Sequence, residues 1–377
     1  MKSVKKPLDW HDPEVRTLHD KIVHGSFINE GMMVAFPMCF PGVTVPIIAD
    51  ESRVTALDAT REGVIYGGTS GKRVHLFVGM FRADMGAVYD MGVVDGAEQC
   101  VAVGCGPAGF AAFVNGPAGA RIVSRELERA PFSLIQEWGF TRKPLKYHAV
   151  PTGGERIVHA VTDPSGRRAF ATTLKHLLVV EIETGAVEVL GELRGVGRLA
   201  VDAGGGILGF DEGDTLWRFD PAAKKLDRRA IALSNGDWAH APKVWARRRG
   251  PGLLYTADGK GDLFALDEAG RFTGPLGRAG LTPVGPMAVT LDGRVFGFCG
   301  DEISRMFCYD PDTGKVTDIG AAVSVIQRRR YGYVFGDAVV GRDGEIVFGE
   351  DDDSGHLWLY FPRIVEKTAA GRTNPQT

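Results

Sequence analysis

A recurring hairpin unit is the feature of this sequence that most restricts its fold. The unit is an apolar strand, a turn with Gly or Asp, a second strand, a polar loop and then an aromatic strand that often ends in Asp. Repeats of about 40–50 residues are typical of β-propellers. Five clear copies and two weaker ones predict seven blades. The clear copies lie at 65–78, 208–220, 254–267, 296–310 and 347–360, and the weaker ones at 110–123 and 169–182.

Each unit is expected to lie within a four-stranded antiparallel meander, because apolar alternation and turn glycines bound its strands. Asp-Pro and Glu-Thr-Gly turns follow the third strand, for example at Asp220, Glu183 and Asp310. A single blade cannot bury both of its faces, so the blades must stack around an axis. An irregular β-sandwich does not explain seven copies of one unit. The sequence therefore predicts an all-β, seven-bladed β-propeller with a short N-terminal helix.

The segments outside the repeat have separate predicted roles. Residues 33–50 are rich in strand-forming residues and are expected to add the outer strand of the last blade, which closes the ring without an open edge. Asp12, Pro13 and Gly25 suit the cap, first turn and end of a short helix. We expect an N-terminal extension over 1–31, the propeller over 32–364 and a polar tail over 365–377.

Composition limits the partners. The formal net charge of −3 and pI of about 6.3 argue against nucleic acid or an anionic membrane. No apolar run approaches the roughly 20 residues of a membrane-spanning helix. The basic N-terminal residues lack an apolar segment of the secretory type, so we expect a cytoplasmic protein. The five cysteines contain no CxxC pair, which favours small buried thiols over disulfides or a zinc site.

The loops that connect successive blades carry the candidate catalytic residues. In a propeller these loops share a face with the loops joining strands two and three of each blade, and ligands meet several blades there. Three of them, at 142–148, 235–240 and 327–333, place His, Tyr or Arg just before an inner strand. These side chains suit removal of a proton next to a carboxylate, whereas the alternative is a solvated loop surface. The predicted catalytic residues are Tyr147, His148, His240, Arg330 and Tyr333.

Roles follow from side-chain chemistry. His240 or His148 is the candidate base and Tyr333 or Tyr147 the candidate acid. Arg330 is expected to hold a substrate carboxylate, because the charge of the enolate must be neutralised. We expect His148, His240, Arg330 and Tyr333 to converge on one mouth of the funnel.

A second group is predicted to bind substrate: Lys72, Arg73, His75, Lys175, Trp238, Arg328 and His356. His75 and His356 occupy the same position in two neighbouring blades, before Leu-Phe and Leu-Trp. Two imidazoles with nearby carboxylates suit a divalent metal, although other residue types fill this position in other blades. We expect no cofactor, with a divalent metal as the alternative.

Other conspicuous residues receive structural interpretations. His159, on an inner strand, is expected to be a hydrogen-bonded core histidine. Arg247, Arg248 and Arg249 end the inner strand of blade five on the opposite face, where we expect them to be solvated. The Gly-rich segments at 104–109 and 203–206 match no complete phosphate-loop pattern and are interpreted as hairpin turns.

The segment Val64-Ile-Tyr-Gly-Gly-Thr-Ser-Gly with His75-Leu-Phe resembles segments of seven-bladed carbohydrate-active propellers. These are the ulvan and related uronate polysaccharide lyases and the propeller α-L-rhamnosidases. The similarity extends over the whole repeat and involves mostly structural residues. It implies a funnel site that uses His, Tyr and Arg on a sugar acid. The absence of a recognisable signal favours a small oligosaccharide or glycoside over a polymer.

These observations favour a lyase that acts by β-elimination on a uronic-acid-containing oligosaccharide or glycoside. Two alternatives remain: a non-catalytic binding or scaffold module, and a lactonase or hydrolase with a metal in the funnel. The fold does not choose between them, because propellers support all three functions. The expected partner is a small molecule or oligosaccharide, without nucleic acid or membrane.

Overall fold

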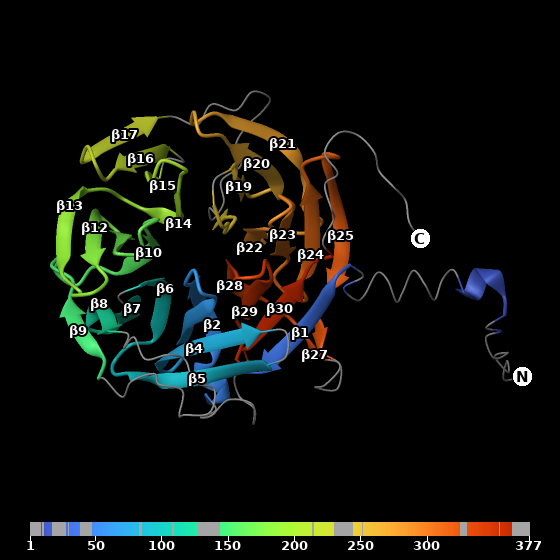
Figure 1. The fold of residues 1–377 in the computed structure, drawn as a ribbon, viewed down its shortest axis with the longest axis horizontal. Coiled ribbons are helices and arrows are strands. Elements are labelled where there is room, and N and C mark those ends of the chain that lie inside the picture. The colour runs from blue at the N-terminus through green and yellow to red at the C-terminus, as the bar shows by residue number, and fades with distance from the viewer. Residues whose placement is uncertain are drawn as a thin grey trace, which may run out of the picture.

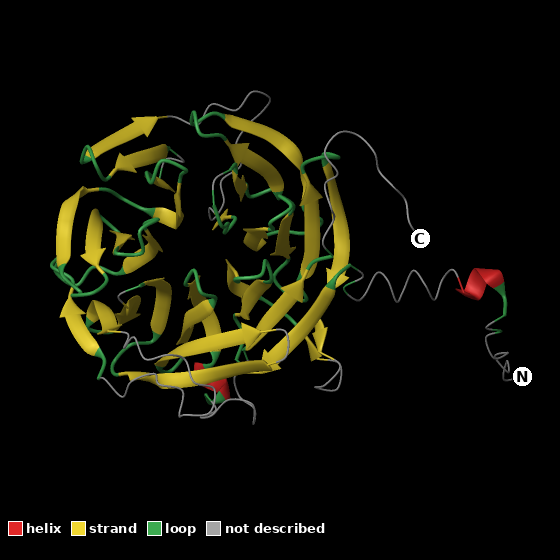
Figure 2. Ribbon diagram, in the orientation of Figure 1, coloured by secondary structure: helices red, strands yellow, loops and turns green. Residues whose placement is uncertain are grey.

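The structure is a computed structural model in which seven four-stranded antiparallel sheets surround a central axis (Figures 1 and 2). The described residues contain only two short helical segments, 13–16 and the 3₁₀ turn η1 (Ala49–Glu51). The predicted all-β seven-bladed propeller is therefore confirmed. The description covers residues 9, 11–16, 28, 30–37, 47–82, 85–107, 109–126, 144–212, 215–229, 244–250, 252–324, 330–353 and 355–363.

Blades one to six each consist of four consecutive strands, from the inner strand at the axis to the outer strand. The first three are β2 (Arg53–Ala59), β3 (Val64–Ser70), β4 (Val74–Arg82) and β5 (Met85–Val94); β6 (Gln99–Gly106), β7 (Gly109–Gly116), β8 (Gly119–Glu126) and β9 (Lys146–Ala149); and β10 (Ile157–Thr162), β11 (Arg168–Thr173), β12 (His176–Glu181) and β13 (Val187–Glu192). The next three are β14 (Val196–Val201), β15 (Ile207–Phe210), β16 (Leu216–Asp220) and β17 (Lys225–Arg229); β18 (Val244–Trp245), β19 (Leu254–Ala257), β20 (Asp262–Leu266) and β21 (Phe272–Arg278); and β22 (Val284–Val289), β23 (Val295–Cys299), β24 (Arg305–Asp310) and β25 (Lys315–Ala321).

Blade seven closes the ring with a strand from the other end of the chain. It contains β28 (Phe335–Val340), β29 (Ile346–Glu350) and β30 (His356–Phe361), and β1 (Met32–Pro37) pairs antiparallel with β30. This confirms the predicted closure, with the strand at the start of the expected segment. A separate hairpin of β26 (Val323–Ser324) and β27 (Arg330–Tyr331) lies outside the ring near β1 (Figure 1).

Glycines in the second strands explain the aromatic residues of the third strands. Gly67 pairs with Phe77 across the sheet, and Gly209 pairs with Trp217. A Cβ atom on Gly67 or Gly209 would lie 2.1 Å or 2.3 Å from the ring of its partner. The aromatic ring therefore lies over the glycine and fills the space between neighbouring blades. Burial of such rings away from water is the main favourable contribution to the stacking of blades.

Local features agree with several sequence expectations. The carboxylate of Asp12 accepts the backbone N–H of Glu14 at 2.8 Å, as expected of a helix cap. The predicted end of this helix, Gly25, lies outside the described residues. The four described cysteines are free and buried, as predicted: Cys100, Cys105, Cys299 and Cys308.

Candidate functional site

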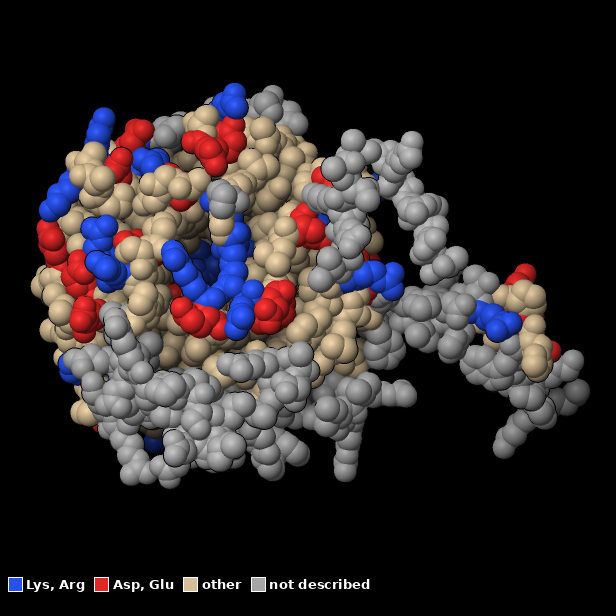
Figure 3. Space-filling model, in the orientation of Figure 1, with Lys and Arg blue, Asp and Glu red and all other residues tan. Residues whose placement is uncertain are grey.

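A cavity of about 690 Å³ opens at the centre of one face of the ring. It is lined by the ends of the inner strands of blades one to five and by the turns that follow these strands. In the space-filling view the hollow has basic atoms on its walls and acidic atoms around its edge (Figure 3). We call this cavity the arginine funnel. It lies on the face opposite to the inter-blade loops on which the sequence analysis concentrated.

Three consecutive arginines at the end of β18 supply most of the positive charge. Arg247 and Arg249 donate to the backbone carbonyls of Leu57 at 2.8 Å and Thr60 at 2.7 Å, which belong to blade one. Arg248 donates to the carbonyl of Gly252. Within the described part of the chain no carboxylate lies within 4.0 Å of these three guanidinium groups, and all three side chains are partly buried. Among the described residues, the three guanidinium groups are therefore held by backbone carbonyls and not by ion pairs.

The sequence analysis placed these arginines on this face and expected them to be solvated; in the structure they are partly exposed and line the cavity. The signal was available: three arginines in a row follow an inner strand. This run of arginines did not locate the cavity, because the packing of side chains across the ring determines which face of the propeller is hollow.

A largely buried ion pair joins opposite blades at the arginine funnel, whose lining includes Arg198. Arg198, on β14 of blade four, pairs with Asp337, on β28 of blade seven, and also donates to the carbonyl of Gly336. Asp337 accepts the backbone N–H of Leu57 at 2.8 Å. The side chains of Arg198 and Asp337 are 22% and 2% exposed. The pair therefore ties blades one, four and seven together across the channel.

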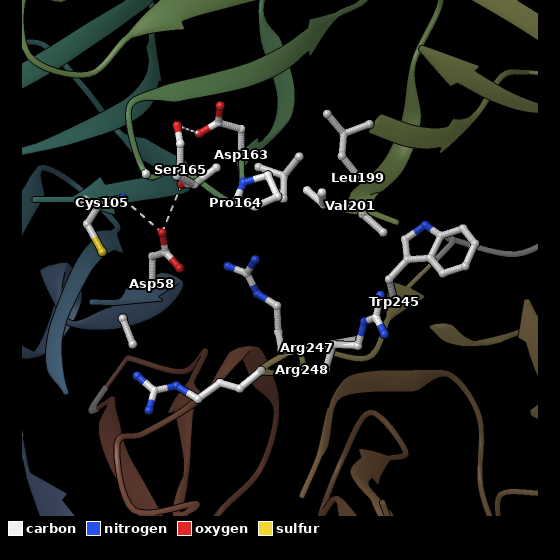
Figure 4. A pocket seen from close by; sticks show the side chains of 18 of the residues that line it. Asp58, Cys105, Asp163, Pro164, Ser165, Leu199, Val201, Trp245, Arg247 and Arg248 are labelled. Carbon is white, nitrogen blue, oxygen red and sulfur yellow. Dashed lines mark hydrogen bonds between the residues drawn. The ribbon is translucent and has the colours of Figure 1, made fainter. Parts of the chain in front are cut away.

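Asp58 is the acidic group that faces the arginines. Its Oδ2 accepts the backbone N–H of Cys105 at 2.9 Å and the hydroxyl of Thr162 at 3.0 Å. Figure 4 shows its carboxylate turned toward Arg247, although no ion pair within 4.0 Å joins them among the described groups. Burial raises the pKa of Asp58, and the charge of Arg247 opposes this effect.

His159 lines the same cavity and is 5% exposed. Its Nδ1 accepts the backbone N–H of Leu199 at 3.1 Å, so the neutral ring carries its proton on Nε2. Burial, and then the charges of Arg198 and Arg247, hold the pKa of His159 well below its usual value. The prediction of a hydrogen-bonded, buried histidine is confirmed.

Two of the predicted catalytic residues lie at the periphery of blade two. Tyr147 and His148 belong to the outer strand β9. The ring of Tyr147 is exposed and contacts the guanidinium of Arg121, 5.6 Å from the ring centroid. His148 Nε2 lies 2.8 Å from the hydroxyl of Ser124. The structure does not bring these two side chains to the funnel.

The remaining predicted catalytic residues occupy other places. Tyr333 precedes β28 on the face opposite to the funnel and is 42% exposed. The backbone of Arg330 lies in β27, outside the ring. His240 lies outside the described residues, as do Trp238 and Arg328 of the substrate-binding group. The structure does not bring His148, Arg330 and Tyr333 together, so their catalytic roles remain predictions.

His75 and its neighbours form a compact charged cluster in blade one. The two ring nitrogens of His75 contact Asp90 and Glu51, each at 2.8 Å, and Arg73 holds Glu51 with two bonds of 2.6 and 2.9 Å. Burial opposes protonation, but the two carboxylates raise the pKa of His75 above its usual value. Lys72 pairs with Asp50 at the surface. These side chains are paired with carboxylates of the protein, and their substrate-binding role remains a prediction.

His356 and Lys175 also lie on the face opposite to the funnel. His356 Nδ1 contacts Glu350 at 2.7 Å, and both side chains are almost fully buried. Lys175 borders a smaller surface cleft between blades three and four, beside His176. No group of three or more side chains suited to a metal occurs in the ranges that the structure describes. His75 and His356 each bind carboxylates of their own blade region instead of forming a shared site.

Comparison with known proteins shows the fold. Neither a family model nor a curated protein matches this chain. Among solved structures, a streptogramin B lyase is similar, with a TM-score of 0.60 and 10% identity over 89% of this chain and 100% of the other. A catalytically inactive virginiamycin B lyase from Staphylococcus aureus, with quinupristin, gives 0.61 and 9% over 88% and 100%. The WD40 propeller domain of Doa1 gives 0.57 and 11% over 88% and 97%.

At such low identity these similarities concern the propeller architecture, which supports both enzymes and binding modules. They do not support the resemblance to carbohydrate-active propellers. In the described ranges, no helix has the length and apolar character needed to cross a membrane.

Proposed function

We propose that the protein is a lyase that binds a small carboxylate-bearing substrate, of the sugar-acid class, in the arginine funnel. The observation that carries this proposal is the set of three guanidinium groups, at Arg247, Arg248 and Arg249, that have no carboxylate partner among the described residues. A guanidinium group holds a planar carboxylate with two parallel hydrogen bonds. The cavity volume is within the range of small-molecule sites.

Arginines also suit the chemistry of β-elimination. The hydrogen next to a carboxylate becomes acidic only when the negative charge of the enolate is stabilised. A cationic, partly buried site provides this stabilisation more strongly than water does, because charge interactions are less screened there. This argument replaces the proposed role of Arg330, whose backbone lies outside the ring.

Binding is tested by calorimetric titration of D-galacturonate, with D-galactose as the neutral control. We expect the uronate to bind and the neutral sugar not to. Arg249→Gln should weaken uronate binding by about 10- to 100-fold, the range expected for loss of a charge-assisted hydrogen bond. Arg271→Gln is the matched control, because Arg271 belongs to the same blade, is exposed and pairs with Asp267.

Catalysis is tested by incubation with trigalacturonate while the ultraviolet absorbance of an unsaturated uronate is followed. Appearance of this product supports a lyase. Uronate binding without any product supports the alternative of a binding module. Equal binding of galactose and galacturonate, or an Arg249→Gln variant that binds like the wild type, contradicts the proposed site.

A further inference from the structure

Asp58 differs from the two funnel aspartates of blades three and four. Asp163 pairs with Arg168 at 3.4 Å, and Asp202 pairs with Arg218 at 2.6 Å. Each of these is held by an arginine of its own blade. Asp58 has no cation within 4.0 Å among the described residues, and it projects from the end of β2 into the cavity.

Three blades fix the orientation of this carboxylate. Asp58 belongs to blade one, Cys105 to blade two and Thr162 to blade three, and both hydrogen bonds reach Oδ2. The other oxygen is turned toward the guanidinium of Arg247 (Figure 4). A carboxylate held in this way has one oxygen in position, and its other oxygen faces the space between it and the arginines.

The neighbouring histidine is not suited to take a proton. The Nδ1 of His159 already accepts a hydrogen bond from Leu199, and the nearby guanidinium groups disfavour a positive charge on the ring. Glu62 is exposed at the edge of the cavity. Asp58 is therefore the described group in the funnel that combines an oriented carboxylate with access to the bound ligand.

We propose that Asp58 is the proton-transfer residue of the funnel and that it serves first as base and then as acid on the same bound uronate. This inference rests on the proposed function, because the arginines must first hold the carboxylate of the substrate. Burial raises the pKa of Asp58, which makes its carboxylate a stronger base than an exposed aspartate.

The steps balance without a further reactant. The Asp58 carboxylate takes the C5 proton of the uronate, and the electron pair of the C–H bond moves into an enolate whose charge lies against Arg247. The pair then forms the C4–C5 double bond while the C4–O bond breaks, and the leaving oxygen takes that bonding pair. Protonated Asp58 gives its proton to this oxygen. The products are an unsaturated uronate and an alcohol, and Asp58 returns to its starting form.

The test separates proton transfer from binding. Exchange of the C5 proton of D-galacturonate for deuterium in D₂O is followed by NMR, and binding is measured by calorimetry. In Asp58→Asn an amide of the same shape keeps an oxygen for Cys105 and Thr162. We expect this variant to bind galacturonate at least as tightly as the wild type, because the substitution removes a negative charge that repels the anionic ligand. We expect its exchange rate to fall by about 10²- to 10⁴-fold.

Thr162→Val provides a second variant that keeps the carboxylate. Loss of the hydroxyl removes one hydrogen bond to the charged form of Asp58, which should raise its pKa and move the rise of exchange with pH to higher pH. Asp58→Asn with wild-type exchange, or Thr162→Val with an unchanged pH profile, overturns the role of Asp58. A wild type that binds galacturonate without exchange also overturns it, but leaves the binding site intact. A wild type that does not bind galacturonate contradicts the proposed function itself.

Discussion

Removal of the Asp337 carboxylate should destabilise the propeller more than most single substitutions. Asp337 is 2% exposed and holds Arg198 from the opposite side of the ring. It also accepts the backbone N–H of Leu57 at 2.8 Å and that of Ala338 at 2.9 Å. Asp337→Ala therefore removes the ionic partner of Arg198 and the side-chain acceptor of two backbone N–H groups.

The structure sets the expected size of the loss. Breaking a buried ion pair by removing one partner costs about 3–5 kcal/mol. The Arg198 side chain is 22% exposed toward the funnel, so water can solvate it in part and the lower end of this range applies. We expect a loss of about 3 kcal/mol in the free energy of unfolding. With an unfolding entropy of about 2 cal/mol/K per residue over 377 residues, this lowers Tm by about 4 °C.

Equilibrium unfolding in guanidinium chloride and differential scanning calorimetry measure this loss. Asp337→Asn is the matched control, because it keeps the shape and one acceptor oxygen and should lose less stability. Arg198→Ala and the double variant complete a double-mutant cycle. The double variant should be less destabilised than the sum of the single variants by about 1–3 kcal/mol. A loss below about 0.5 kcal/mol for Asp337→Ala, or simple additivity, refutes the cross-ring pair as a stabilising contact.

Three further predictions concern stability. Burial and nearby arginines lower the pKa of His159, so the free energy of unfolding should decline by up to about 1.4 kcal/mol per pH unit as the pH falls below about 6.5. Unfolding of His159→Gln, measured as a function of pH, should show a weaker decline. Burial opposes protonation of His75, but its two carboxylate partners raise its pKa. Its contribution to the free energy of unfolding should therefore be present below about pH 6.5 and decline as the pH rises through the folded pKa. Glu51→Gln should weaken this decline in the same assay. Gly106→Ala should lower Tm, because its Cβ would lie 1.8 Å from a carbonyl oxygen, whereas the matched Gly280→Ala, with no atom within 4 Å, should not.

The fold was predictable because its determinants are local and repeated. Gly67 and Phe77 lie ten positions apart in one unit, and Gly209 and Trp217 lie eight apart in another, so the hairpin that pairs them can be recognised from the sequence. Closure by β1 followed from a physical requirement, since an unpaired edge strand of blade seven would be a template for aggregation.

The site was less predictable because its contacts join distant blades. Arg247 donates to Leu57, 190 positions away, and Arg198 pairs with Asp337, 139 positions away. Nothing in either local sequence indicates these partners. His75 also contacts partners outside its own strand: its ring nitrogens meet Asp90 and Glu51, which lie 15 and 24 positions away.

The arrangement around Arg247 explains how the propeller holds a guanidinium group in a defined position without an ion pair to any described carboxylate. Its backbone N–H donates to Met287 at 2.8 Å and its carbonyl accepts from Val289 at 2.7 Å, which joins the inner strands of blades five and six. Its side chain then reaches across the channel to Leu57 at 2.8 Å. Backbone and side chain are therefore fixed before any ligand arrives. A guanidinium group has five N–H donors, and this contact uses one of them, so most of its hydrogen-bonding capacity remains for an anion. Because the Arg247 side chain loses little conformational freedom when a ligand binds, more of the electrostatic attraction contributes to binding the ligand and to stabilising the charge that develops on it.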